Sequence, residues 1–159
     1  MKHLLILFMV FINLSVFSQV QEEYTNTYED DTSKQSLLYS KSKMYVVDIF
    51  KSANNVIQND DPIYGSIVCK GVVETMGYYF SFTLKIRVKD GASKITVTDI
   101  FNSSAPYKYS KLNMSKYEGI WKNNITEKIY VNIMGSVHRQ LDRIVDDYDN
   151  FMMSEDDGF

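Results

Sequence analysis

The chain has 159 residues, 17 Lys and Arg against 20 Asp and Glu, a formal net charge of −3, and a single cysteine, Cys69. This acidic balance argues against nucleic-acid binding, which normally needs a basic surface, and one cysteine excludes an internal disulfide. The length suits one domain with a sizeable hydrophobic core. Stability must therefore come from packing rather than from covalent cross-links.

The N-terminus has the pattern of a secretory signal peptide. Lys2 precedes an apolar run over residues 4–12, and small residues follow near a polar boundary. The run is shorter than the roughly 20 residues that span a bilayer, and no cysteine follows it closely to carry a lipid. We expect residues 1–18 to be removed by cleavage near Ser18–Gln19. The protein is then exported and soluble, periplasmic or secreted, with no stable membrane anchor.

A polar segment and a helix are predicted next. Residues 19–32 alternate weakly, as a short edge strand or a linker does. From residue 33 to about residue 53, apolar residues recur at helical spacing, with Thr32 or Ser33 as the candidate N-cap. The predicted apolar stripe comprises Leu38, Tyr45 and Ile49, flanked by Leu37, Met44, Val47 and Phe50.

Three or four strands follow the helix. Residues 55–60 suit a short edge strand, residues 65–74 a longer one, and residues 77–101 a hairpin. Its turn, Asp90–Gly91, is a strong signal for a type I′ turn with positive φ at both positions. The first arm alternates between an apolar set (Phe80, Phe82, Leu84, Ile86, Val88) and a polar set (Ser81, Thr83, Lys85, Arg87, Lys89). The alternation predicts an antiparallel meander with one apolar and one polar face.

A long connection over residues 102–123 leads to a second helix. Asn124 and Glu127 resemble a capping box at its start. The predicted apolar seam of this helix comprises Met134, Val137, Leu141, Ile144, Tyr148 and Phe151. Residues 154–159 form an acidic tail. Residues 33–153 are thus predicted to be one α+β domain, in which a single antiparallel sheet of four to five strands packs two helices on one face.

Part of the chain resembles a known family. The segments "SLLYSKSKMYVVDIFKSANNVIQNDDPIYGSIVCKG" and "FSFTLKIRVKDGASKITVTDI" are similar to an uncharacterised family of exported bacterial domains, found mainly in Bacteroidetes. The similarity covers residues 33–101 well and the C-terminal helix loosely. It implies a TATA-binding-protein-like, two-layer fold and a bacterial envelope setting. It implies no catalytic residues, and the DNA binding of the fold's namesake does not transfer with the fold.

No motif predicts catalysis. Cys69 alternates with Ile67 and is expected to be a buried small hydrophobe, whereas His138 lies beside the seam and is expected to face solvent. The carboxylate runs lack the ligand spacing of a calcium loop, and there is no phosphate-binding glycine loop or zinc motif. We therefore expect a non-enzymatic protein with no metal site and no cofactor. A hydrolase ranks a distant third among the functional hypotheses, behind the two given below.

Two surfaces are candidates for binding a partner. One is the polar hairpin face, with Thr83, Lys85, Arg87, Lys94 and Thr96. The alternative is that it is only the solvated side of a sheet, where Thr and Lys are common. The other is the long connection, where lysines interleave with Tyr107, Tyr109, Tyr117 and Trp121. Those aromatic residues suit an interface, and they suit equally well an anchor that holds the loop over the sheet.

The leading hypothesis is an interaction module of the bacterial envelope that binds an unidentified protein or glycan and no nucleic acid. The alternative is a carrier of small apolar ligands, with a pocket between the helices and the sheet. These hypotheses place the binding site in different parts of the protein. The first needs an exposed polar surface, and the second needs an internal cavity.

Overall fold

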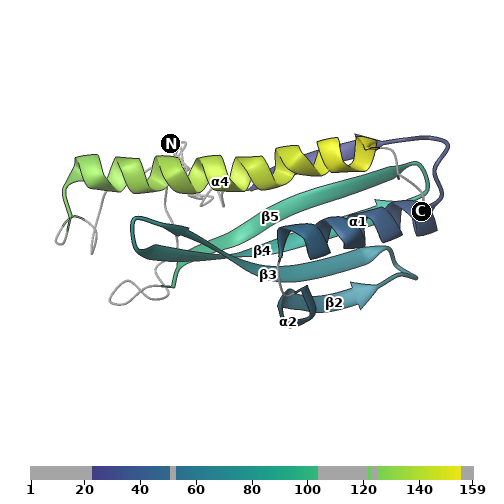
Figure 1. Ribbon diagram of the computed structural model, residues 1–159, viewed down its shortest axis with the longest axis horizontal. Helices are drawn as coiled ribbons and strands as arrows, with labels where there is room; N and C mark the ends of the chain where they lie inside the picture. Colours follow the sequence, from purple (N-terminus) through teal and green to yellow (C-terminus); the bar gives the residue numbers. More distant parts are fainter. Residues whose placement is uncertain (1–22, 51–52, 104–121, 123–124, 155–159) are drawn as a thin grey trace, which may run out of the picture.

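The computed structural model describes residues 23–50, 53–103, 122 and 125–154. One antiparallel sheet has the strand order β1-β5-β4-β3-β2, and the helices α1 and α4 lie on the same side of it (Figure 1). The elements in chain order are β1 (Tyr24–Glu29), α1 (Gln35–Ile49), α2 (Ala53–Val56), β2 (Ile57–Asp61), β3 (Ser66–Thr75), β4 (Tyr78–Lys89), β5 (Ala92–Asn102) and α4 (Glu127–Met153). The predicted α+β architecture is confirmed, and the weak edge strand is present as β1.

The core lies between the sheet and the two helices. Alternate residues of the three central strands point to this side, and those of β4 are the apolar set predicted from the sequence. The sheet contributes Ile67, Cys69, Phe80, Phe82, Leu84, Ile86, Ile95 and Val97, all at most 1 % exposed. The helix α4 contributes Tyr130, Ile133, Met134, Val137, Leu141, Val145, Tyr148 and Met152. The three central strands therefore bury their apolar side chains on one face, as a two-layer fold requires.

A tight turn and a bulge keep the alternating side chains aligned with the core. Met76 and Gly77 both have positive φ, 51° and 80°, so the two-residue turn between β3 and β4 has the type I′ conformation. A bulge places Asp99 and Ile100 opposite Phe82, with Asp99 at a φ of 53°. Because the extra residue shifts the register by one, Ile100 points into the core.

The predicted type I′ turn at Asp90–Gly91 is wrong, although the hairpin is present. Gly91 has a φ of 77°, but Asp90 is not among the residues with positive φ. The turn is held instead by the chain that enters α1, because Gly91 N–H donates to Ser33 O (3.0 Å) and Asp30 N–H donates to Gly91 O (2.9 Å). Contacts with a distant segment thus override the local turn preference.

Both helices differ from prediction in detail. α1 ends at Ile49 and buries Leu38, Tyr39, Ser42, Tyr45 and Val46, whereas the flanking residues Leu37, Met44 and Val47 are exposed. α4 begins at Glu127, and its cap is Thr126, whose hydroxyl accepts a hydrogen bond from Ile129 N–H (3.4 Å). Asn124 lies outside the described residues. Four of the six predicted seam residues are buried, and Ile144 and Phe151 pack against the rim of the core.

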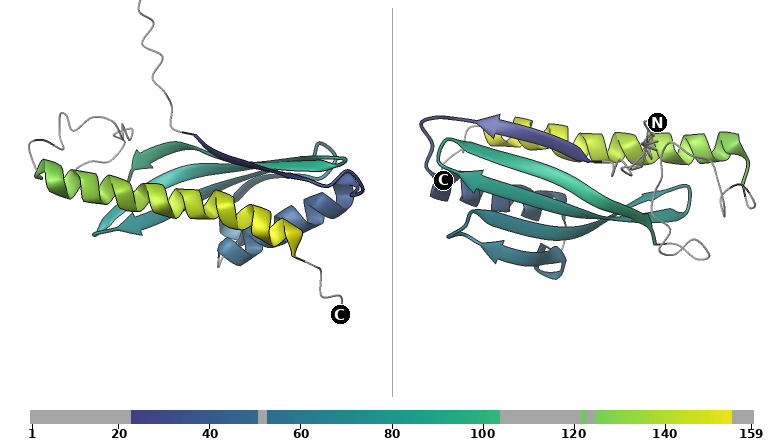
Figure 2. Two further views of the ribbon diagram at one scale, coloured as in Figure 1. Left: turned by 90° about the horizontal axis from the view of Figure 1, so that it is seen from above. Right: turned by 180° about the vertical axis from the view of Figure 1, so that it is seen from behind.

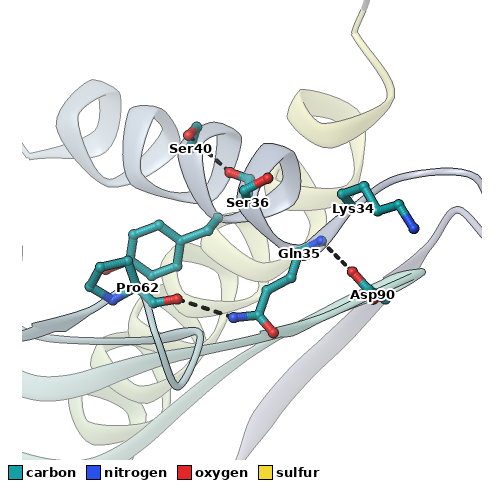
Figure 3. Close-up of a pocket in the computed structure, with 7 residues that line it drawn as sticks. Lys34, Gln35, Ser36, Ser40, Pro62 and Asp90 are labelled. Atoms are coloured by element: carbon teal, nitrogen blue, oxygen red, sulfur yellow. Dashed lines mark hydrogen bonds between the residues drawn. The ribbon is translucent and has the colours of Figure 1, made fainter.

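The N-terminus of α1 is capped by a residue of the hairpin. Its own N-cap residue, Lys34, makes no side-chain cap. The Asp90 carboxylate accepts a hydrogen bond from Gln35 N–H at 2.8 Å, and the Gln35 side chain donates to Pro62 O at 3.1 Å (Figure 3). The same side chain donates to Ile63 O at 3.1 Å. A carboxylate at this position satisfies a free N–H group and interacts favourably with the helix dipole. The turn that closes β4 and β5 therefore also fixes where α1 begins.

Polar contacts join the two helices to each other and to the sheet. The buried Tyr148 hydroxyl lies 2.8 Å from the Ser42 hydroxyl of α1 and donates to the Ser93 hydroxyl of β5 at 2.7 Å. The Lys41 ammonium donates to Met152 O (2.9 Å) and Ser154 O (2.8 Å) at the end of α4. These bonds satisfy polar groups that would be costly to bury alone. In the described part of the chain, no helix is both long and apolar enough to cross a membrane.

We expect Asp90→Ala to lower the free energy of unfolding by about 1 kcal/mol, the usual cost of losing an N-cap. Asp90→Asn keeps an acceptor oxygen and should cost less. Urea unfolding followed by circular dichroism measures both. Asp31→Ala is the matched control, because Asp31 is an exposed acid in the segment that passes Gly91. Equal effects of Asp90→Ala and Asp31→Ala would show that the charge, and not the cap, matters.

Candidate interaction surface

The open face is the side of the sheet that faces away from α1 and α4. Seen from behind, the described strands cross in front of both helices, and no described helix covers this side (Figure 2, right). The strand β4 contributes Ser81, Thr83, Lys85, Arg87 and Lys89 to the open face. Its neighbours add Lys94, Thr96 and Thr98 from β5, Ser66, Val68, Lys70 and Val72 from β3, Thr25, Thr27 and Glu29 from β1, and Asn59 and Asp61 from β2.

The strand register gathers the cations at the centre of the open face. Arg87 lies directly opposite Lys94, and Lys85 lies directly opposite Thr96. Lys85, Arg87 and Lys89 follow one another at every second position of β4, a spacing of about 7 Å in an antiparallel strand. All four cationic side chains are exposed. The result is a compact cationic group on an otherwise acidic protein.

The carboxylates do not neutralise these cations. Among the described residues the salt bridge is the pair Lys43–Asp60, and neither residue lies with the cationic group. The Asp60 carboxylate accepts hydrogen bonds from Lys43 and Tyr39 on α1, which lowers its pKa. By contrast, Glu29 lies opposite Ala92 and Asp61 opposite Ser66, near the two edges of the sheet. The central cations thus keep their charge exposed to solvent.

Thr83 is less accessible than the sequence predicts. It belongs to the open face but is only 3 % exposed, and its hydroxyl accepts a hydrogen bond from the Lys70 ammonium at 2.6 Å. Lys70 lies directly opposite Thr83 on β3. Lys70 is not among the binding residues predicted from the sequence, although alternation from the buried Cys69 places it on the polar side. Thr83 therefore positions Lys70 rather than offering a contact of its own.

The other predicted binding residues divide into two groups. The structure brings Lys85, Arg87, Lys94 and Thr96 together on the open face, with Thr96 half-buried. The aromatic residues of the long connection, Tyr107, Tyr109, Tyr117 and Trp121, lie outside the described residues. The candidate site therefore comprises residues of the sheet alone.

Cys69 and His138 are not brought together. The buried Cys69 lies on β3, and burial raises the pKa of its thiol to about 11. His138 is half-buried instead of facing solvent, and its Nδ1 is hydrogen-bonded to the hydroxyl of Tyr24 on β1. Tyr24 and Cys69 lie in one row across the sheet, with β5 and β4 between them, so their backbones are about 14 Å apart. A thiol of this pKa is not an activated nucleophile.

Nothing in the described part of the chain suggests a metal centre or an internal ligand cavity. No group of three or more His, Cys, Asp or Glu side chains there could hold a metal ion. Two hollows among the described residues lie at the surface. One surrounds the capped N-terminus of α1, and the other lies between Met76 and the Val131 turn of α4. Both are open to solvent and have mixed polar and apolar linings, unlike the enclosed apolar cavity that a carrier needs.

Comparisons with known proteins agree with this architecture. A crystal structure of a TBP-like protein from Parabacteroides distasonis ATCC 8503 is similar over 82% of this chain and 93% of its own, with a TM-score of 0.61 and 16% identity. A DUF4468 family protein from Bacteroides ovatus ATCC 8483 is similar over 87% and 90%, with a TM-score of 0.52 and 13% identity. At these identities the likeness concerns the fold alone. No curated protein matches the chain significantly.

The family assignment comes from the sequence of the sheet and α1. Residues 24–102, from the start of β1 to the end of β5, match the family model described as a domain of unknown function (DUF4468) with TBP-like fold. The matched region contains every strand of the sheet and therefore the whole open face. This chain belongs to the DUF4468 family, whose domain has a TBP-like fold.

Proposed function

We propose that this protein is a non-enzymatic, exported interaction module of the bacterial envelope that binds an anionic protein or glycan through the open face. The observation that carries the proposal is the exposed cationic group at the centre of a sheet face that no described helix covers. The group stands out because the chain as a whole carries a net charge of −3. A locally cationic face on an acidic protein selects partners by charge and orients them during encounter.

The pairing of Arg87 with Lys94 supports a binding role over a merely solvated face. Like charges directly opposite each other on neighbouring strands destabilise a sheet. An ordinary solvated face would place Thr, or a charge of opposite sign, at one of these positions. The free protein bears this repulsion, and an anionic group bound between the two side chains would relieve it. The pair therefore costs stability without a partner and favours binding with one.

The shape of the surface favours an extended partner. The cations are spread along β4 and across to β5, and none of them lines either of the two hollows described above. Contacts of this kind suit an acidic segment or a glycan chain with repeated anionic groups better than a single small molecule. Nucleic acid is not proposed, because the negative net charge would oppose a long polyanion beyond this face.

Charge reversal provides the direct test. We expect Lys85→Glu/Arg87→Glu to weaken retention on immobilised polyglutamate and on heparin at least roughly tenfold. Elution in a salt gradient measures the effect, since contacts between exposed charges weaken with ionic strength. The matched control is Lys128→Glu/Arg143→Glu, which changes the net charge equally at two exposed cations of α4. If both double variants elute at the same salt concentration while folded, the open face is not the binding surface.

Removal of the like-charge pair should have opposite effects on stability and binding. We expect Lys94→Gln to raise the free energy of unfolding by about 0.5 kcal/mol, because it ends the repulsion of Arg87. The same change should weaken polyanion binding roughly threefold. Lys89→Gln is the control, since Lys89 lies opposite the uncharged Ala92. A less stable Lys94→Gln variant with unchanged binding would contradict this account.

The proposed location is tested by the mass of the exported protein. We expect the protein recovered from outside the cytoplasm to lack residues 1–18 and to begin at Gln19, because the N-terminal pattern is that of a cleaved signal peptide. Intact-mass spectrometry after expression in a Gram-negative host measures this. A protein that keeps residues 1–18 and stays in the cytoplasmic fraction would refute the export proposal without affecting the binding tests.

A further inference from the structure

The side of α1 that faces away from the sheet carries an apolar stripe. Leu37, Met44 and Val47 are 49%, 52% and 55% exposed, and Ser40 completes the row. These four residues, here called the outer stripe, follow at intervals of three, four and three positions and therefore share one side of the helix. The buried residues of α1 lie on the opposite side, and Figure 1 views the molecule from the outer side, with α1 in front of the sheet.

A helix of a two-layer domain normally turns polar residues to solvent. α4 exposes Ile129, Val131 and Met153 without forming a row, whereas the exposed apolar residues of α1 share one side of the helix. Single exposed apolar residues are common, but a contiguous row on one helix marks a contact surface. The outer stripe is remote from the open face, because the sheet lies between them (Figure 2).

We propose that the outer stripe is covered by the outer stripe of a second copy of this protein, with the two α1 helices antiparallel about a two-fold axis. This register places Leu37 opposite Val47 of the partner subunit and Ser40 opposite Met44 of the partner subunit. Each contact then occurs twice, as a two-fold interface requires. The small Ser40 leaves room for the long methionine side chain, which adapts readily to irregular gaps.

The charges beside the outer stripe select the antiparallel arrangement. Lys34 and Asp48 are exposed near opposite ends of α1, on the same flank of the stripe. A two-fold axis across antiparallel helices keeps equal flanks together, so Lys34 faces Asp48 of the partner subunit. A parallel two-fold pairing would place the two copies of Lys34 on opposite sides of the contact, and likewise for Asp48, so that neither charge would meet an opposite one. Opposite charges beside an apolar row set register and orientation in the same way in coiled coils.

The dimer does not depend on the proposed binding function, but it would extend it. With α1 at the centre, the two open faces would point away from each other and remain accessible. Each dimer could then hold two anionic segments, or two sites on one chain, and gain from avidity. Because each copy contributes three apolar side chains, the interface is at the small end of biological contacts. We expect a dissociation constant of about 50 µM.

Sedimentation equilibrium of the purified protein between about 5 and 500 µM tests the dimer. We expect the average mass to rise from that of the monomer towards that of the dimer. Met44→Glu should remove this rise, because it would place two carboxylates in the apolar contact. Val131→Glu, at an equally exposed apolar residue of α4, should leave it unchanged. A monomer at every concentration, or a dimer that persists in folded Met44→Glu, would overturn the inference.

Exchange of the flanking charges tests the register. Lys34→Glu alone and Asp48→Lys alone should each weaken the dimer roughly fivefold, and the double variant should restore it. No restoration in the double variant would overturn the antiparallel register. A second experiment removes residues 155–159. If the full chain is monomeric and only the shortened chain dimerises, the end of the chain itself covers the stripe, and the dimer proposal is wrong.

Discussion

The structure depends on one constraint: a single face of the five-stranded sheet must be covered by two helices. One of them, α1, lies within the region that matches the family, and the other, α4, follows that region. The inward side chains of β3, β4 and β5 are almost completely removed from water. Burial on this scale is the main favourable term in folding, but it does not by itself fix the positions of the helices. That task falls to the few polar groups within the apolar layer. Tyr148 is the central one, since its hydroxyl reaches α1 and β5 at once.

The helix ends provide a second level of organisation. The first turn of α1 is satisfied by Asp90 of the hairpin, and the last carbonyl groups of α4 are satisfied by Lys41 of α1. Each helix therefore has one terminus held by an element distant in sequence. The hairpin thus caps α1 and α1 caps α4, so that neither helix reaches its full stability before its capping element is in place. These capping contacts all lie on the covered side of the sheet, so the open face takes no part in holding the helices.

Much of the fold was predictable because burial of one face imposes a period of two on the strands and one near 3.6 on the helices. The alternation of β4 and the seam of α4 show this directly. α1 was harder, since its apolar residues occur on both sides, and periodicity does not say which side meets the sheet. The conformation of the Asp90–Gly91 turn and the cap of α1 depend on contacts with residues 30–35, which no local pattern contains. The cationic residues of the open face followed from alternation, whereas Lys70 and the Arg87–Lys94 juxtaposition required the register between strands.

The short strand β2 has a consequence for how the protein behaves at high concentration. It forms one edge of the sheet, spans five residues, and its pairing with β3 shifts register between Ile57 and Asn59. Its carboxylates, Asp60 and Asp61, follow directly after this irregularity. A brief, bent and negatively charged edge is a poor template for the strand of another molecule. The sheet is thereby guarded against open-ended growth into fibres, a hazard for any protein that carries an exposed sheet edge.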